Sequence, residues 1–127
     1  MKAVVIDTSA ILALIQKESG YDFVEKYINS SVISTVNFAE TLIVLNRNGF
    51  NQKEVEGLLE GIVSDIAPFD QEQACIASNL DSVTKQYGLS LGDKSCIALG
   101  IYRNLPILTA DKLWTKLNID QEIILIR

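Results

Sequence analysis

Four acidic side chains stand at positions where a protein of alternating strands and helices could gather them into one site. They are Asp7, Glu40, Asp93 and Asp111. The sequence contains no His, so the usual general base at neutral pH and the commonest transition-metal ligand are both absent. Any hydrolytic chemistry must therefore rest on carboxylates, hydroxyls, lysines or a metal-bound water.

Glu40 is the acid whose position is hardest to explain by structure alone. On a helix its neighbours three and four residues away are Val36, Asn37, Ile43 and Val44, which are largely apolar. An unpaired carboxylate in such surroundings costs roughly a few kcal/mol, or its pKa rises by a matching amount. We therefore expect a positive group to face Glu40.

A divalent cation is the simplest counterion for four converging acids. Without one, carboxylates at close range repel each other and some stay protonated at neutral pH. Oxygen ligands with no His and no paired Cys favour Mg²⁺ or Mn²⁺ over Zn²⁺. Such an ion also lowers the pKa of a bound water, which replaces the missing His base.

Each acid also has a purely structural interpretation. Asp7 could cap the helix that follows it, although Thr8 and Ser9 would serve equally well. Asp93 and Asp111 could be caps or partners of a helix dipole, and Glu40 could pair with a basic side chain. For these interpretations to hold throughout, four separate coincidences must fall at one edge of the fold.

The elements that would position these acids alternate along the chain. Short apolar runs predict strands at residues 3–7, 32–34, 65–69, 106–109 and 122–127. Helical composition and spacing predict helices at residues 10–17, 21–28, 35–48, 52–63, 71–87, 94–104 and 111–117. The alternation predicts an α/β fold with a mostly parallel sheet, covered by helices on both faces, in which Pro68 places the third strand at an edge or ends it. Ligands collect at the carboxyl edge of such a sheet, which Asp7 and Asp111 would share and Asp93 would join.

Length and composition predict one ordinary globular domain over residues 1–127. The apolar fraction is 48% and the charged fraction 21%, and no composition shift marks a second unit. Cys75 and Cys96 have no metal-binding or disulfide spacing, so both are expected to be small core residues in a reducing compartment. No apolar segment is long enough to span a membrane and no leader pattern is present, so we expect a cytoplasmic protein.

The net charge of −5 gives no long-range attraction to nucleic acid. Metal ions would invert the potential locally, and Lys94, Lys112 and Lys116 stand near two of the acids. The alternative for each lysine is a solvated surface charge. Trp114, in a short helix, is expected to pack against the core rather than to stack on a base.

Four motifs together resemble the PIN-domain ribonucleases, and specifically the VapC-like toxins of type II toxin–antitoxin pairs. The motifs are VVIDTSAILALI at the N-terminus, FAETL around Glu40, LSLGDKSCIALG around Asp93 and LPILTADKLW around Asp111. They occur in the family's order and spacing over almost the whole chain. The first motif is common by itself, whereas the four together are specific.

The resemblance implies a three-layer α/β fold with a short, mostly parallel sheet, and endonucleolytic cleavage of RNA. It implies Mg²⁺ or Mn²⁺ held by an acidic quartet at Asp7, Glu40, Asp93 and Asp111, with Thr8 and Thr109 at the hydroxyl positions that orient the site. It also implies a homodimer, silenced by a small antitoxin whose tail covers the acidic pocket. Family members often carry a further acid just after the last motif, where this chain has residues 112–116, KLWTK. The number of ions, one or two, stays open.

Other readings of the sequence differ in how well they fit. A receiver-type phosphoacceptor domain shares the fold class and an Asp after the first strand, but it needs adjacent acids in the first loop and a Lys before a Pro. Pro68 and Pro106 follow Ala67 and Leu105 instead. A haloacid-dehalogenase-type phosphatase needs an acid where Ser9 stands, and a flap-nuclease-like enzyme needs a larger chain. A non-catalytic interaction module of the same fold stays open as the alternative.

Overall fold

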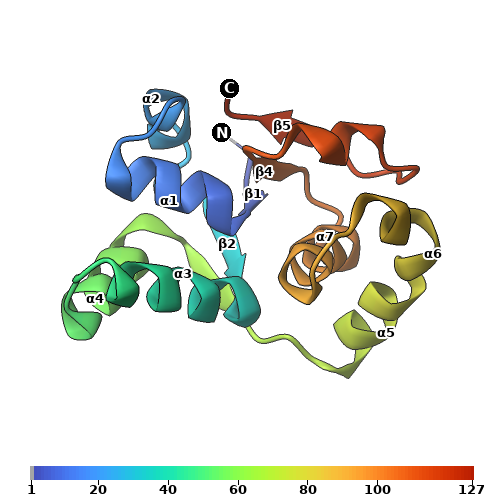
Figure 1. Ribbon diagram of the computed structural model, residues 1–127, viewed down its shortest axis with the longest axis horizontal. Helices are drawn as coiled ribbons and strands as arrows, with labels where there is room; N and C mark the ends of the chain where they lie inside the picture. The colour runs from blue at the N-terminus through green and yellow to red at the C-terminus, as the bar shows by residue number, and fades with distance from the viewer. Residues whose placement is uncertain (1) are drawn as a thin grey trace.

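Short strands alternate with helices along residues 2–127, which the computed structural model describes (Figure 1). The strands are β1 (Val4–Ile6), β2 (Ser31–Ser34), β3 (Asp65–Ala67), β4 (Ile107–Thr109) and β5 (Ile123–Leu125). The α-helices are α1 (Thr8–Gln16), α2 (Tyr21–Glu25), α3 (Thr35–Arg47), α4 (Gln52–Ile62), α5 (Gln71–Asn79), α6 (Asp81–Thr84) and α7 (Leu91–Arg103). Two 3₁₀ helices complete the order, η1 (Lys85–Tyr87) and η2 (Lys112–Lys116).

The five strands form one sheet in the order β3-β2-β1-β4-β5, and all the recorded pairs are parallel. β1 is central: Val5 pairs with Val32 of β2 on one side and with Ile107 of β4 on the other. The chain builds outward from β1 to β2 and β3, and then crosses to β4 and β5. The order therefore reverses between β1 and β4, which is where open parallel sheets bind ligands. β3 lies at an edge, as Pro68 predicted.

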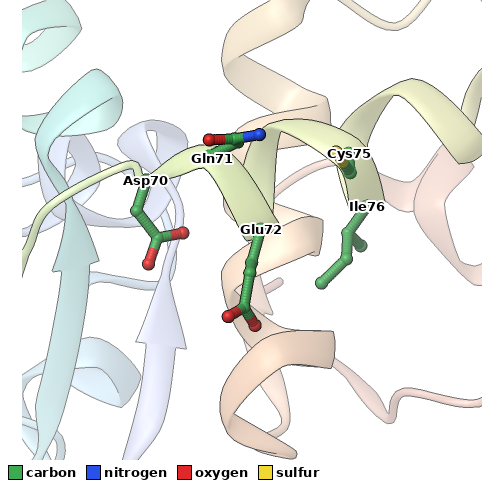
Figure 2. Close-up of a pocket in the computed structure, with 5 residues that line it drawn as sticks. All are labelled: Asp70, Gln71, Glu72, Cys75 and Ile76. Atoms are coloured by element: carbon green, nitrogen blue, oxygen red, sulfur yellow. The ribbon is translucent and has the colours of Figure 1, made fainter.

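The stretch between β3 and α7 differs from the single long helix predicted for residues 71–87. It is divided into α5, α6 and η1. Asp70 caps α5, accepting a hydrogen bond from the backbone N–H of Gln73 at 3.0 Å. On the solvent side of α5, Cys75 is exposed, so its assignment to the core was wrong. It lines a cavity of about 520 Å³ with Ile76, Asp70, Gln71 and Glu72 (Figure 2).

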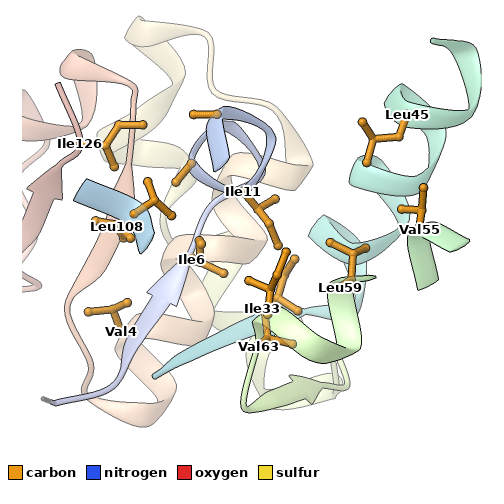
Figure 3. Close-up of a cluster of buried hydrophobic side chains, with 14 residues drawn as sticks. Val4, Ile6, Ile11, Ile33, Leu45, Val55, Leu59, Val63, Leu108 and Ile126 are labelled. Carbon is orange, nitrogen blue, oxygen red and sulfur yellow. The ribbon is translucent and has the colours of Figure 1, made fainter. Parts of the chain in front are cut away.

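Two apolar clusters, one on each face of the sheet, join the strands to the helices. Along β1 the side chains alternate: Val4 and Ile6 enter the first cluster, and Val5 enters the second. The first cluster lies beneath α1–α4 and includes Leu45 and Leu59 (Figure 3). The second lies beneath α5–α7 and the C-terminal segment, which is the right-hand side of Figure 1. This arrangement confirms the three-layer α/β fold.

Trp114 of η2 belongs to the second cluster and is fully buried, which confirms that it packs against the core. The short helix that Asp111 opens was thus correctly located, although it is a 3₁₀ helix. None of the helices within residues 2–127 combines the length and the apolar character needed to cross a membrane.

Candidate active site

Asp7 stands at the carboxyl end of the central strand, between β1 and α1. It is only 4% exposed. Two hydroxyls donate to its Oδ2: Ser9 Oγ at 2.7 Å and Thr109 Oγ1 at 2.9 Å. Asp7 occupies the N-cap position of α1 but makes no side-chain capping hydrogen bond. Its carboxylate is therefore held by β4 and the first turn of α1, and the capping interpretation does not apply.

The pKa of Asp7 is raised to about 6, chiefly by burial and to a smaller extent by repulsion from Asp93, although hydrogen bonds from Ser9, Thr109 and the backbone of Thr8 oppose the rise. A carboxyl group in this position is partly protonated near neutral pH. A cation at the site would favour the ionised form and lower the pKa again.

Glu40, on α3, is held by neutral donors rather than by a positive side chain. Its Oε1 accepts hydrogen bonds from Thr8 Oγ1 and from Asn37 Nδ2, each at 2.9 Å. The ion pairs found within residues 2–127 join Lys94 to Asp81 and Arg103 to Asp65, so none of them involves Glu40. Within the described residues no basic side chain pairs with Glu40, so the structural alternative for this acid does not apply.

Asn37 ties Glu40 to the start of α7. The same Nδ2 that donates to Glu40 also lies 3.1 Å from the carbonyl oxygen of Gly92, and Asn37 itself is fully buried. Gly92 permits the close approach of α3 and α7, because a Cβ there would lie 2.5 Å from Cδ of Glu40. A side chain at position 92 would thus displace the Glu40 carboxylate.

Asp93 and Asp111 both take part in helix capping, Asp93 in the first turn of α7 and Asp111 as the N-cap of η2. Asp93 forms a capping box with Ser90: its carboxylate accepts from the Ser90 N–H at 3.0 Å, and the Ser90 hydroxyl accepts from the Asp93 N–H at 3.1 Å. Asp111 accepts from the Leu113 N–H at 3.0 Å. The structural interpretation of these two acids is therefore correct, and it does not exclude a second role.

The four acids share one electrostatic environment. Burial raises the pKa of Asp93, and repulsion from Glu40 and Asp111 adds to the rise. The buried thiol of Cys96, one turn after Asp93 on α7, has a pKa raised well above its usual value, first by burial and then by Asp7, Asp93 and Glu40. Each of the four carboxylates is thus close enough to influence at least one of the others or their common neighbour. The structure brings together the residues that the sequence selected.

The donor chemistry of this cluster fits a hard divalent cation, but the side chains are not arranged as a formed ligand cage. Within residues 2–127, no three His, Cys, Asp or Glu side chains are placed so that they could hold a metal ion together. Asp93 and Asp111 point their carboxylates at backbone donors. Each cap uses one carboxylate oxygen, Oδ2 of Asp93 and Oδ1 of Asp111, which leaves the other oxygen for a cation. The repulsion from Glu40 and Asp111 that adds to the burial-raised pKa of Asp93 would favour binding of a cation.

Sequence reasoning missed three residues that build this site. Ser9 donates to Asp7 and also accepts the backbone N–H of Ala110 at 3.0 Å, so it joins α1 to the end of β4. Asn37 and Gly92 join α3 to α7. A hydroxyl two residues after Asp7, and an amide one helical turn before Glu40, were the signals available.

The three lysines that lie near the acids in the sequence have different surroundings. Lys94 pairs with Asp81 at 3.3 Å, and its side chain is 20% exposed. Lys112 and Lys116 are exposed on η2. Their contribution to binding stays a prediction.

Comparison with known proteins agrees with this fold. A PIN domain family model matches residues 4–119. No curated protein matches the chain in sequence. Among solved structures, DNA-bound VapBC from Salmonella typhimurium is 16% identical, with all of both chains covered and a TM-score of 0.73. VapBC2 from Rickettsia felis, bound to a promoter DNA fragment, is 15% identical, with 96% of this chain and 97% of that one covered and a TM-score of 0.72.

The toxin VapC20 from Mycobacterium tuberculosis, described as cleaving the sarcin–ricin loop, is also 15% identical. The match covers 90% of this chain and 94% of that one, with a TM-score of 0.72. At such identities the likeness establishes a shared fold. Because the family model covers nearly the whole chain, this chain belongs to the PIN domain family.

Proposed function

We propose that this protein is a metal-dependent endoribonuclease and the toxin of a toxin–antitoxin pair. The observation that carries the proposal is the hydrogen-bond network that links the four acids: Thr109 contacts both the Asp7 carboxylate and the Asp111 N–H, and Asn37 joins Glu40 to Gly92, which directly precedes Asp93. The family and the solved relatives support it: several of those relatives are toxin–antitoxin complexes, and one is a toxin that cleaves an RNA loop.

The four acids would have different roles, which depend on the hydrogen bonds that hold each carboxylate. Asp7, Asp93 and Asp111 would ligate Mg²⁺ or Mn²⁺, and Glu40 would be a further ligand or an outer base. The ion, when bound, would supply a polarised phosphate and a water of lowered pKa. Ser9 and Thr109 occupy Oδ2 of Asp7, which leaves its Oδ1 for ligation. Thr8 and Asn37 fix Oε1 of Glu40, so that Oε2 would accept a proton from the water attacking in line with the leaving oxygen.

The proposed partners are an RNA substrate, a cognate antitoxin protein and a second copy of the chain. Exposed apolar residues on the first face of the sheet, Ile28 after α2 and Ile43 on α3, are candidates for protein contacts. The antitoxin would have to cover a strongly acidic pocket, so a basic segment in its tail is expected to reach the quartet.

The activity is tested by incubating the purified protein with a pool of structured RNAs in Mn²⁺, in Mg²⁺ and in EDTA. Asp7→Asn tests the quartet, and Glu72→Gln is the matched control because it removes an exposed acid on α5 that lies outside the quartet. Cleavage is expected only with the ion, in the native protein and in Glu72→Gln. Cleavage that persists in EDTA and in Asp7→Asn would refute the metal and quartet proposal. Complete inactivity on every RNA would favour the interaction-module alternative.

The toxin role is tested separately in cells. Expression of the native protein is expected to arrest growth, whereas Asp7→Asn at the same level leaves growth unchanged. Harmless expression of a protein that cleaves RNA in vitro would show an RNase without toxin function.

A further inference from the structure

A groove of about 400 Å³ lies between α5 and the first turn of α7, with no role in the quartet described above. Phe69, Ala74 and Ala77 line it on the α5 side, Leu91 and Lys94 on the α7 side, and Ser78 and Asp81 complete the rim. The lining combines apolar surface with one carboxylate and one ammonium group.

The groove opens at the same edge of the sheet as the acidic site. Phe69 follows the carboxyl end of β3, and its backbone N–H donates to Thr35 Oγ1 at 3.1 Å, at the start of the helix that carries Glu40. On the other side, Leu91 directly precedes Gly92, whose carbonyl is held by Asn37. The groove and the quartet are therefore neighbours that share the first turn of α7.

The exposure of Leu91 calls for an explanation. Its side chain is 63% exposed, the highest value among the exposed large apolar residues. Most of the other apolar residues of α7 are buried in the second cluster, so Leu91 adds nothing to the core. An apolar side chain held in water beside an acidic site, and opposite a half-buried phenylalanine, is suited to contact the flat face of a ligand.

The charged pair on the rim defines what the edge of such a ligand must offer. Asp81 accepts from Lys94 through Oδ1 at 3.3 Å, and its side chain is 60% exposed. Its Oδ2 is left to face adjacent N–H donors. Lys94 pairs with Asp81 at the mouth of the groove, where its ammonium group could contact a phosphate. Its positive charge also offsets part of the negative charge of this edge.

We infer that this groove binds one unstacked guanine base of the RNA, adjacent to the phosphodiester at the quartet. Guanine presents two neighbouring N–H donors, N1 and N2, to a single carboxylate. Adenine, cytosine and uracil do not offer that pair. Contacts with Phe69 and Leu91 would hold any base, so the preference for guanine would rest on Asp81. This inference rests on the proposed function, because it assigns a nucleotide to the same RNA substrate.

The binding test uses the ¹⁵N-labelled Asp7→Asn protein in EDTA, titrated by NMR with each of the four nucleoside 5′-monophosphates. The absence of divalent ions prevents a signal from ion-mediated phosphate binding at the quartet. The guanine nucleotide is expected to shift amides of Phe69, Ser78 and Leu91, and to bind about tenfold more tightly than the cytosine nucleotide. Equal affinity for all four nucleotides, or shifts confined to other parts of the chain, would overturn the inference.

Two exposed substitutions separate the apolar contact from the base-reading contact. Leu91→Ser is expected to weaken binding of all four nucleotides about tenfold, and Asp81→Asn to bring guanine within about twofold of the others. Leu58→Ser, at a comparably exposed leucine on α4 in the opposite layer, is the control and should change neither value. Thermal unfolding of each variant verifies that it is folded.

Light scattering after size-exclusion chromatography decides whether the groove is instead occupied by a second copy. If Leu91→Ser alters the molecular mass and leaves nucleotide affinity unchanged, the groove is an interface between copies and the inference is wrong. Cleavage of RNAs that differ only in the base next to the cut tests the groove separately from the proposed ribonuclease activity. Metal-dependent cleavage without base preference would refute guanine binding in the groove but not the ribonuclease activity. Guanine binding without any cleavage would refute the ribonuclease activity but not guanine binding.

Discussion

Replacing Gly92 by alanine should disturb the acidic site with little effect elsewhere. The new Cβ would lie 2.5 Å from Cδ of Glu40, and the carboxylate oxygens would be in comparable conflict. The conflicting atoms belong to the carboxylate at the flexible end of the Glu40 side chain, so this side chain will rotate away and α7 will keep its position. In moving, it loses the hydrogen bonds from Thr8 and Asn37 that fix Oε1.

The expected loss of stability follows from opposing contributions. Two hydrogen bonds to a charged group are worth about 1.5–3 kcal/mol each, and part of this is recovered when water solvates the displaced carboxylate. Alanine in a helix gains up to about 1 kcal/mol over glycine. The net change is a destabilisation of about 2 kcal/mol, or roughly 5–10 °C in Tm for a chain of this size. Activity should fall much further, by at least about a hundredfold, because Glu40 no longer reaches its position.

The assays are thermal unfolding by circular dichroism, Mn²⁺ binding by calorimetry and cleavage of the RNA pool. Gly100→Ala and Gly61→Ala are matched controls. The first would place a Cβ 2.7 Å from Cγ1 of Ile107 in the core, so it should lower Tm but leave the Mn²⁺ affinity of the folded protein intact. The second meets no atom within 4 Å and should raise stability by about 0.5–1 kcal/mol. A Gly92→Ala protein with native Mn²⁺ affinity and native activity would refute the proposed dependence on Glu40.

Three further predictions follow from the surroundings of Asp7 and the two cysteines. Because the pKa of Asp7 is raised to about 6 from an ordinary 3.8, the folded state binds the proton of this carboxyl group more tightly than the unfolded state does. This proton contributes up to about 3 kcal/mol to the free energy of unfolding; the contribution is complete below about pH 4 and is lost as the pH rises through about 6. Urea unfolding from pH 4 to 7 without divalent ions should show this loss in the native protein and not in Asp7→Asn. An equal change of the free energy of unfolding with pH in the two proteins would contradict the prediction. Thr109→Val removes a donor to Asp7 and an acceptor for the Asp111 N–H, so it should cost about 1–3 kcal/mol by urea unfolding and raise the Asp7 pKa further; unchanged stability and pH dependence would show that the hydroxyl is dispensable. A thiol reagent should modify Cys75 rapidly and Cys96 only after unfolding, as mass spectrometry would show, and rapid labelling of both in the native protein would contradict their different burial.

The central part of the fold was predictable because it depends on local pattern. The strands around β1 and β4 are continuous apolar runs, and a parallel sheet buries such strands on both faces. Their ends then fix where Asp7 and Thr109 emerge. Topology alone brings these two residues to one place, although 102 positions separate them in the sequence.

The residues that sequence reasoning missed depend on partners far along the chain. Asn37 is important because its amide lies 3.1 Å from the carbonyl oxygen of Gly92, and Ser9 is important because it accepts the N–H of Ala110. The residues around Asn37 and Ser9 in the sequence do not indicate these distant partners. The break between α5 and α6 is of the same kind. Residues 71–87 have helical composition throughout, but packing around Leu80 and Thr84 divides the stretch into shorter helices.

The neutral partners of Glu40 show where an energetic argument was incomplete. A carboxylate among apolar neighbours was expected to face a positive group, and among the described side chains a hydroxyl and an amide donate to it. Hydrogen bonds to a carboxylate stabilise its ionised form as a nearby cation would. Sequence spacing showed that Glu40 needed a partner but could not show which chemical class would provide it.

The capping box at Ser90 and Asp93 affects how inactive variants should be chosen. Alanine at position 93 removes a carboxylate from the quartet and also removes the acceptor for the Ser90 N–H, so lost activity would be mixed with about 1 kcal/mol of lost helix stability. Asparagine keeps a side-chain oxygen that can accept the same N–H, and it removes only the charge. For cell experiments in which protein abundance tracks stability, Asp93→Asn is therefore the interpretable loss-of-function variant, and Asp93→Ala is not.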